Sequence, residues 1–335
     1  MRIIVDTMGG DNAPLEILKG CALARKEHDI EFVLTGNKEL IEETIKNEQL
    51  DLGKYEIVHT DIVVSMEDEP TCVIKDKKGS SLGKAFTMLR QGEGDAVVSA
   101  GSTGAVLVGA TMTVGRIRGI KRPALATVLP GDNGPVMLMD CGANVECRPE
   151  MLVQFGIMGS IYMNKIQNID NPRVMLANVG TEDTKGGPLQ KEAFELLKKA
   201  PLNFCGNIEG RDLLASITDV VVADGFSGNL ILKTCEGVAA MMYGNLKGVF
   251  KKNFVSKIAA AMVMSGLKVF KKKMDYTEYG GAPLMGIAKP VIKAHGSSNA
   301  VAFKNALRQA IEYHNNNVIS EIQTSVAQLK EVEEK

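Results

Sequence analysis

The chain has 335 residues, of which 45% are hydrophobic, and its formal net charge at pH 7 is −1. This length and apolar content can bury a large core, and they exclude a mainly disordered chain. The near-zero charge, the absence of tryptophan and the small number of other aromatic residues argue against a nucleic-acid partner.

The amino terminus, MRIIVDTMGG, reaches an acid at Asp6 before any apolar run long enough for a signal peptide. The six cysteines form no CxxC pair, and the four histidines lie far apart with no HExxH motif. We therefore predict a cytoplasmic protein that needs no metal and no cofactor, in which the cysteines are small core residues.

Five segments in chain order share one arrangement, a short β-branched strand followed by a glycine-rich loop and a helix. Their strands read IIVD, DAVVSA, VMLMD, VMLANVG and DVVVAD. This alternation predicts an α/β fold with a mostly parallel sheet flanked by helices. The apolar runs at 136–139 and 220–222 are typical of central strands. Because ligands bind beyond the carboxyl ends of such strands, we expect the glycine-rich loops to converge on one site.

The loop after the second of these strands, SAGSTGA at 99–105, is a candidate anion site. Its backbone amides, the hydroxyls of Ser102 and Thr103 and the following helix could bind a phosphate. A simple turn capped by serine and threonine would use the same residues. Dinucleotide binding is disfavoured, because no GxGxxG motif follows the first strand and Asp11 lies where the pyrophosphate would approach. The sequence also contains no complete P-loop and no GxSxG motif for a serine nucleophile.

Three later loops carry further polar candidates. Asp224 and Asn229 flank the loop DGFSGN and could hydrogen-bond a ligand, or Asn229 could be an ordinary helix cap. Lys185 lies among glycines and acids, where it could neutralise an anion or form a surface salt bridge. His295 begins HGSSNA, ahead of a helical run, and a structural role is the alternative to a ligand contact.

Residues 237–274 contain eight lysines and no acid, so this stretch carries +8 and the rest of the chain −9. The uncharged part, 258–267, is shorter than the roughly 20 residues that span a bilayer. A cationic amphipathic helix suits anionic headgroups, at about 1 kcal/mol per lysine, and also an acidic protein. Packing of its apolar side inside the fold or in a dimer is the structural alternative. The expected membrane or carrier contacts are Lys251, Lys252, Lys257, Lys268, Lys271, Lys272 and Lys273.

Eight segments taken together are specific: MGGDNAP, SAGSTGA, GIKRPALATVLP, DCGAN, NVGTEDTKG, GNIEGRD, DGFSGN and HGSSNA. From Met1 to about residue 315 they resemble the PlsX family of bacterial phosphate acyltransferases. The resemblance implies transfer of a fatty acyl group from acyl carrier protein to inorganic phosphate, giving acyl phosphate for glycerophospholipid synthesis. It also implies a homodimer that is peripherally associated with the membrane.

The resemblance further implies a fold like that of isocitrate and isopropylmalate dehydrogenases and phosphotransacetylases. We expect a single domain over 1–335, with 237–275 as a protruding cationic amphipathic helical segment. A further expected partner is the membrane glycerol-3-phosphate acyltransferase that acts downstream.

No catalytic cysteine or serine arrangement is visible, and phosphate itself can attack a thioester, whose leaving thiol has a pKa of about 8.5. We predict that Lys185 neutralises charge on the tetrahedral intermediate and that Asn229 and His295 position the substrate or donate to the oxyanion. The residues expected to bind substrate, or to order the loops around it, are Asp6, Asp11, Gly101, Ser102, Thr103, Gly104, Asn144, Glu182 and Asp224.

Two other functions fit parts of the sequence. A metal- and nicotinamide-dependent decarboxylating dehydrogenase would share the architecture, but it needs clustered acids for Mg²⁺ and an adenine pocket, and the sequence shows neither. A non-catalytic membrane scaffold would use only the lysine-rich segment. Phosphate-dependent consumption of acyl carrier protein thioester separates the acyltransferase from both.

Overall fold

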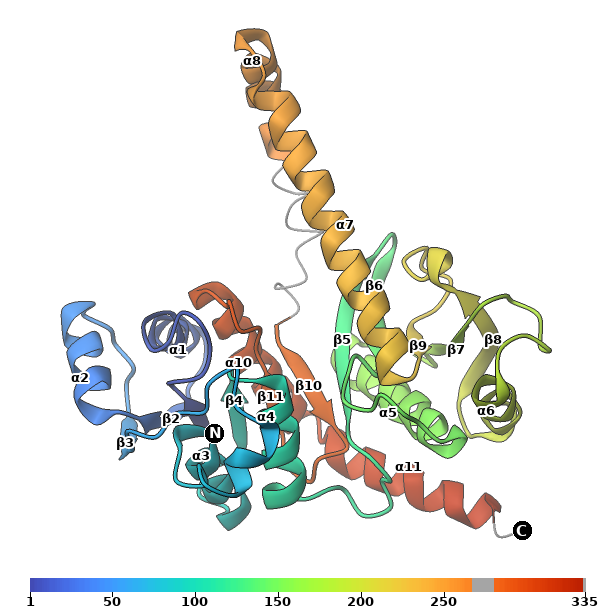
Figure 1. Cartoon of the computed structure of the whole chain (residues 1–335), viewed down its shortest axis with the longest axis horizontal. Helices are drawn as coiled ribbons and strands as arrows, with labels where there is room; N and C mark the ends of the chain where they lie inside the picture. The colour runs from blue at the N-terminus through green and yellow to red at the C-terminus, as the bar shows by residue number, and fades with distance from the viewer. Residues whose placement is uncertain (267–279, 334–335) are drawn as a thin grey trace.

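The structure, a computed structural model, describes residues 1–266 and 280–333. Eleven strands form one sheet in the order β3-β2-β1-β4-β11-β10-β5-β6-β9-β7-β8, with helices packed along it (Figure 1). Among the described residues, seven strand pairs are parallel and three are antiparallel. The predicted class, a mostly parallel α/β sheet flanked by helices, is confirmed. The finer likeness to isocitrate dehydrogenase stays a prediction.

The strands are β1 (Arg2–Asp6), β2 (Glu31–Gly36), β3 (Tyr55–His59), β4 (Ala96–Ser99), β5 (Ala124–Gly131), β6 (Gly134–Met139), β7 (Arg173–Asn178), β8 (Asn203–Glu209), β9 (Val220–Val222), β10 (Ala282–Met285) and β11 (Val291–Lys293). The α-helices are α1 (Leu15–Glu27), α2 (Lys38–Asn47), α3 (Ser81–Gln91), α4 (Thr103–Gly109), α5 (Pro149–Gln167), α6 (Pro188–Lys199), α7 (Gly225–Lys251), α8 (Phe254–Met262), α10 (Ala300–Asn315) and α11 (Val318–Glu333). Each of the five expected strand–loop–helix units is present.

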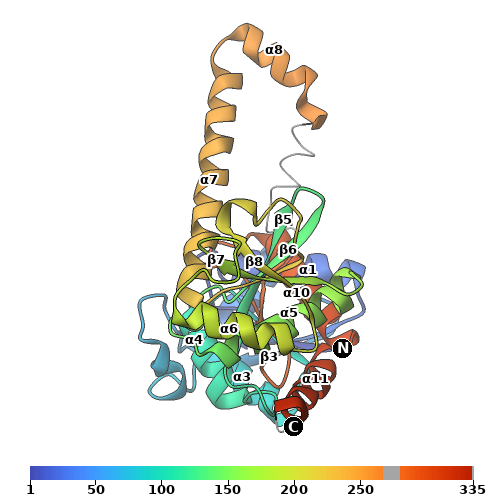
Figure 2. The ribbon, with the colours of Figure 1, turned by 90° about the vertical axis from the view of Figure 1, so that its right-hand side faces the viewer.

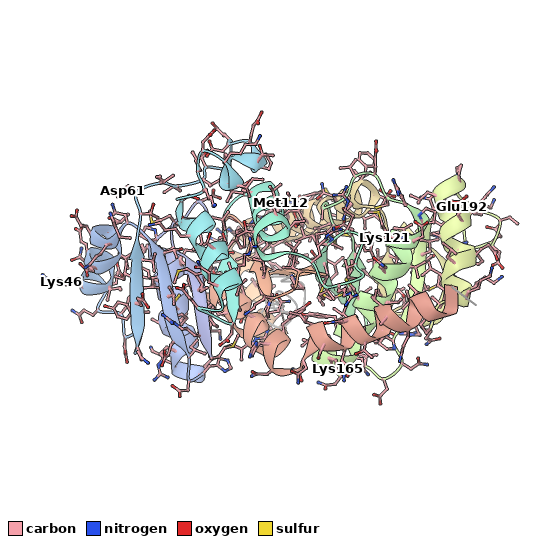
Figure 3. All side chains as sticks on the ribbon, turned by 90° about the horizontal axis from the view of Figure 1, so that it is seen from below. Lys46, Asp61, Met112, Lys121, Lys165 and Glu192 are labelled. Carbon is pink, nitrogen blue, oxygen red and sulfur yellow. The ribbon has the colours of Figure 1, made fainter. Side chains whose placement is uncertain are left out.

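Both faces of the sheet are buried, which explains why its strands are continuously apolar. In β1, Ile4 belongs to a cluster that includes Leu82 of α3, whereas Ile3 and Val5 belong to a cluster that includes Ile17 of α1. Alternate residues of one strand therefore pack on opposite sides. Each such side chain contributes about 1.5–3 kcal/mol when it is fully buried. Seen from below, α2 lies at one end of the molecule and α6 at the other (Figure 3).

The two ends of the sheet run in opposite directions, and β10, β5 and β6 make the change. β10 is antiparallel to both β11 and β5, and β5 is antiparallel to β6. Ser99 at the end of β4 lies opposite Lys293, which lies opposite Ala282 of β10. Met139 at the end of β6 lies opposite Ala126 of β5. The carboxyl ends of β4 and β6 thus approach the middle of the sheet from opposite sides and meet near β5.

Helices α7 and α8 project away from the sheet (Figures 1 and 2). With 27 residues, α7 is roughly 40 Å long at 1.5 Å per residue. Three of the expected contact residues, Lys251, Lys252 and Lys257, lie at the end of α7, just after it and on α8, and all three are exposed. Lys268 and Lys271 to Lys273 lie outside the described residues, and the amphipathic character of the whole segment stays a prediction. None of the described helices is long and apolar enough to span a bilayer.

Candidate functional site

A cavity of about 360 Å³ lies where the two directions of the sheet meet. Loops and strands that are distant in the sequence line it, and they contribute hydroxyl, amide, imidazole and ammonium groups. The polar lining includes Thr103, Thr127, Asn229, Lys233, Lys293 and His295. Three of the predicted site residues, Thr103, Asn229 and His295, therefore meet in one place.

Backbone contacts join the loops that follow β1, β4 and β11. The backbone N–H of Asp11 donates to the carbonyl of Gly296 at 2.8 Å, which ties the first loop to HGSSNA. A Cβ on Gly9 would lie 2.7 Å from the backbone nitrogen of Gly101, so these two loops can approach only because Gly9 has no side chain. The three glycine-rich segments are thus packed together, as their positions after neighbouring strands predict, and Thr103 and His295 of the second and third line the cavity.

A second set of contacts joins the loops that follow β6 and β9. The buried carboxylate of Asp140 accepts backbone N–H bonds from Leu125 at 3.0 Å and Asn144 at 2.7 Å. The carbonyl of Asn144 in turn accepts from the N–H of Gly225 at 2.7 Å. A Cβ on Gly228 would lie 1.8 Å from the carbonyl oxygen of Asp140, so glycine is required there. This packing places α7, which begins in the second loop, beside the first loop and brings Asn229 to the cavity.

A row of polar side chains crosses three neighbouring strands at the edge of the cavity. Asp6 lies opposite Ser99, and Ser99 lies opposite Lys293, in parallel register. Register partners in a sheet point to the same face, and the Ser99 Oγ donates to the Asp6 Oδ2 at 2.7 Å. Burial raises the pKa of the Asp6 carboxyl, while hydrogen bonds from Ser81 and Ser99 oppose that shift. Through this hydrogen bond to Ser99, Asp6 holds the first residue of the SAGSTGA loop in place.

Lys293 is the cation of this row, and only 7% of the residue is exposed. Its Nζ donates to the carbonyl of Ala294. Burial lowers the pKa of Lys293 to about 8, although the charges of Asp11 and Asp6 oppose this effect. The ammonium form still predominates at neutral pH. Lys293 was not among the residues chosen from the sequence.

His295 and an ion pair of α7 also line the cavity. The Nδ1 of His295 lies 2.9 Å from the Oγ of Ser297. Partial burial, together with the charges of Lys233 and Lys293, lowers the pKa of His295, so the imidazole is neutral at pH 7. Lys233 and Glu236 form a pair at 2.7 Å. The cavity therefore contains the buried ammonium of Lys293, the ammonium of Lys233 in its ion pair, and the neutral imidazole of His295.

Cys141 also lines the cavity, and its thiol is not a nucleophile at neutral pH. The residue is 3% exposed, and its Sγ donates to the carbonyl of Leu138 at 3.2 Å. Burial raises the pKa of the Cys141 thiol to about 12. Because the thiolate is the reactive form, a covalent acyl-cysteine has no support here.

Several sequence candidates have structural contacts outside the cavity lining. Lys185 is exposed, and its Nζ lies 3.9 Å from the Oε1 of Glu182. The carbonyl of Glu182 accepts from the side-chain amide of Asn207 on β8, which holds this loop against the outer strand. Asp224 caps α7 by accepting from the N–H and the hydroxyl of Ser227, both at 2.8 Å.

The remaining candidates support the loops. Ser102 is the N-cap of α4 but makes no side-chain capping bond. A Cβ on Gly104 would lie 2.6 Å from the Cγ of Pro70, so this glycine allows close packing. The Asn144 side chain bridges the carbonyl of Pro123 at 2.8 Å and the Asp140 carboxylate at 2.9 Å. Within 1–266 and 280–333, no group of three or more His, Cys, Asp or Glu residues is placed to hold a metal ion.

The family model described as fatty acid synthesis protein matches residues 1–321. A phosphate acyltransferase from Thermoanaerobacterium thermosaccharolyticum is 48% identical over 97% of each chain. Similar proteins with the same description come from Alkaliphilus oremlandii, at 46% identity over 98% of each chain, and from Clostridioides difficile, at 43% over 99% of this chain and 98% of the relative. The chain belongs to the PlsX family of phosphate acyltransferases. It is therefore an acyltransferase, and the reaction of its family is acyl transfer to phosphate.

Solved structures outside this family share the fold of the phosphate acyltransferase. A phosphotransacetylase from Streptococcus pyogenes aligns over 93% of this chain and 94% of its own, with a TM-score of 0.59 at 18% identity. A branched-chain phosphotransacylase from Enterococcus faecalis aligns over 94% and 99%, with a TM-score of 0.55 at 14% identity. A 4-hydroxythreonine-4-phosphate dehydrogenase from Burkholderia phymatum reaches 0.51 at 13% identity, over 93% and 97%. At these identities the likeness shows the fold alone.

Proposed function

We propose that this acyltransferase moves a fatty acyl group from the thioester of acyl carrier protein to inorganic phosphate. An oxygen of HPO₄²⁻ attacks the carbonyl carbon and forms the C–O bond, and the C–S bond then breaks. The proton of the phosphate passes to the departing sulfur, which leaves acyl phosphate and free carrier thiol. We further propose that the acyl phosphate is used for glycerophospholipid synthesis.

The observation that carries this proposal is the composition of the cavity. It holds the ammonium of Lys293, the ion pair of Lys233 and Glu236, hydroxyls, an amide and an imidazole, and its cysteine is a protonated thiol. Such a site can bind a tetrahedral anion and stabilise an oxyanion, but it provides no thiolate for an acyl-enzyme. Direct attack by bound phosphate is the chemistry that these groups support best. Thr103 of α4 and Asn229 of α7, which both line the cavity, are suited to positioning the two reactants.

The projecting helices support a proposal about where the donor arrives. Exposed apolar side chains such as Phe254, Val255 and Met262 accompany the exposed lysines of α7 and α8. We propose that this surface meets an anionic membrane and the acidic acyl carrier protein, so that the acyl chain travels along α7 to the cavity. Homodimer formation and hand-over of acyl phosphate to a membrane glycerol-3-phosphate acyltransferase are parts of the same proposal.

Incubation of the purified full chain with a palmitoylated acyl carrier protein and phosphate tests the reaction. Acyl phosphate is trapped with hydroxylamine as the hydroxamate, and free carrier thiol is titrated in parallel. We expect the two products in equal amounts and neither without phosphate. A second donor, palmitoyl-coenzyme A, tests the carrier. Equal or faster reaction with coenzyme A would overturn the proposed donor, and thiol release without phosphate would overturn the proposed nucleophile.

A further inference from the structure

Lys293 is a buried cation in the lining of the cavity, and the proposed reaction has not yet given it a role. Its position follows from the sheet, because the residue ends β11 between Ser99 of β4 and Ala282 of β10. Its neighbours on both sides are strands of the core, and only 7% of the residue is exposed. It lies in the lining of the cavity together with Thr103, Asn229 and His295.

The contacts of Lys293 leave part of its hydrogen-bonding capacity unused. An ammonium has three N–H donors, and in the described part of the chain the Nζ donates to one carbonyl, that of Ala294. No carboxylate of the described residues pairs with it within 4.0 Å, and the Oδ2 of the nearby Asp6 accepts from Ser99. A buried charge without a pairing anion is costly, and such groups are retained where a ligand supplies the anion.

We propose that Lys293 is a catalytic residue that binds the inorganic phosphate in the cavity and holds it for attack on the thioester. Lysine is well suited to this role, because its compact ammonium is a point charge that binds phosphate oxygens without a fixed plane. Lys293 would hold the phosphate at a buried part of the cavity lining, to which Asn229 and Lys233 of α7 also contribute. This assignment rests on the proposed function, since it names the group that holds the nucleophile of that reaction.

The charged groups around Lys293 determine how its binding depends on pH. Asp6 of β1 and Asp11 of the following loop favour the ammonium, while Lys233 of α7 opposes it. His295 is neutral at pH 7, the Cys141 thiol stays protonated, and Glu236 is paired with Lys233. With a pKa of about 8, Lys293 loses its charge as the pH rises through 8, whereas an ordinary lysine, with a pKa of 10.5, is still charged there. Phosphate affinity should fall over that range.

Phosphate binding can be measured without any acyl donor. Inorganic phosphate should raise the Tm of the full-length protein at pH 7, because a ligand that binds only the native state stabilises it. We expect this shift to be lost in Lys293→Met and kept in Lys293→Arg. Lys46→Met is the matched control, since Lys46 is an exposed lysine on α2 at the end of the molecule (Figure 3). Sodium chloride at the same ionic strength controls for general salt effects.

Steady-state kinetics give the second readout. In Lys293→Met, the KM for phosphate should rise at least tenfold, and in Lys293→Arg the fall of kcat/KM above pH 8 should move to higher pH, because arginine stays charged. A purely structural lysine would leave the pH profile unchanged. An unchanged phosphate-dependent Tm shift in Lys293→Met, or a fall in kcat at unchanged phosphate KM, would overturn the assignment.

The phosphate-binding measurement and the assay for acyl phosphate together separate this inference from the proposed function. If phosphate raises the Tm through Lys293 but no acyl phosphate forms, the phosphate site stands and the proposed reaction fails. If acyl phosphate forms equally well in Lys293→Met, the reaction stands and the role of Lys293 fails. Should Lys293→Met not fold, the shifted pH profile of Lys293→Arg decides the question alone.

Discussion

Lys293 and Ser99 lie directly opposite each other on the parallel strands β11 and β4, and the hydroxyl of Ser99 donates to Asp6 rather than competing for the lysine. The serine thus separates the buried cation from the buried carboxyl at the same level of the sheet. Asp6 is close enough to favour the charge of Lys293 but does not pair with it. The ammonium therefore remains available to an anionic ligand.

Lys293→Met should stabilise the protein at pH 7 when phosphate is absent. The folded pKa, about 8, lies below the ordinary value of 10.5, so the charged lysine costs the folded state on the order of 3 kcal/mol. Between these two pH values the unfolded state binds more protons, and the wild type gains stability as the pH rises. The difference between variant and wild type in urea unfolding should therefore shrink from pH 7 to pH 10. A constant difference would contradict the lowered pKa.

Cys141→Ala should keep its activity within a few-fold. The thiol is protonated at neutral pH and hydrogen-bonded to Leu138, so it performs no covalent step in the proposed mechanism. Loss of the buried sulfur should lower the free energy of unfolding by about 1 kcal/mol. The kcat and the unfolding midpoint, measured on the same preparation, separate the two effects. A hundredfold loss of kcat in a folded variant would point to a cysteine nucleophile.

Lys185→Ala should lower turnover about tenfold or more while the Tm stays unchanged. Lys185 lies in a glycine-rich loop outside the cavity lining and is only loosely paired with Glu182, so its loss should not disturb packing. Its expected role is to bring a positive charge to the tetrahedral intermediate. The phosphate KM should be unaffected, in contrast to Lys293→Met. Lys191→Ala on α6 is the control, and full turnover in Lys185→Ala would remove this lysine from the mechanism.

Replacement of Lys251, Lys252 and Lys257 by glutamate should release the protein from anionic vesicles. Each lysine near a charged membrane contributes about 1 kcal/mol, so loss of three should weaken binding at least a hundredfold. Sedimentation with vesicles of phosphatidylglycerol and phosphatidylcholine measures the bound fraction. The triple variant Lys46→Glu, Lys191→Glu and Lys199→Glu has the same net charge elsewhere on the surface. Equal release by both variants would refute a specific membrane surface on α7 and α8.

The strand–loop–helix units and the general class of fold follow from local patterns in the sequence. The run VVV, for example, forms the fully buried β9, and α5 and α6 begin at Pro149 and Pro188. The reversal of strand direction does not follow, because β10 and β5 pair through registers that no local pattern encodes. Convergence of the loops was expected from the carboxyl ends of a mostly parallel sheet, whereas the structure achieves it through strands that end near one another from opposite directions.

The site was predictable where a polar residue ended an apolar strand. Asp6 and the SAGSTGA loop were found by this signal, and Thr103, Asn229 and His295 do line the cavity. Lys293 carries the same signal, since it ends the strand VIK and only Ala294 separates it from HGSSNA. It was missed because a lysine is ordinarily exposed, and only the tertiary structure shows that β4 and β10 enclose it.

The pairing of β4 with β11 has a consequence for biosynthesis. β11 is the last of the described strands in chain order, and its Val291 lies opposite Val97 of β4. Until the ribosome has synthesised β11, the edge of β4 that pairs with it has no partner. The backbone N–H and C=O groups of this edge are then open to other chains. This edge stays open until residues 291–293 have been synthesised, and pairing with another chain during that interval would block the native position of β11.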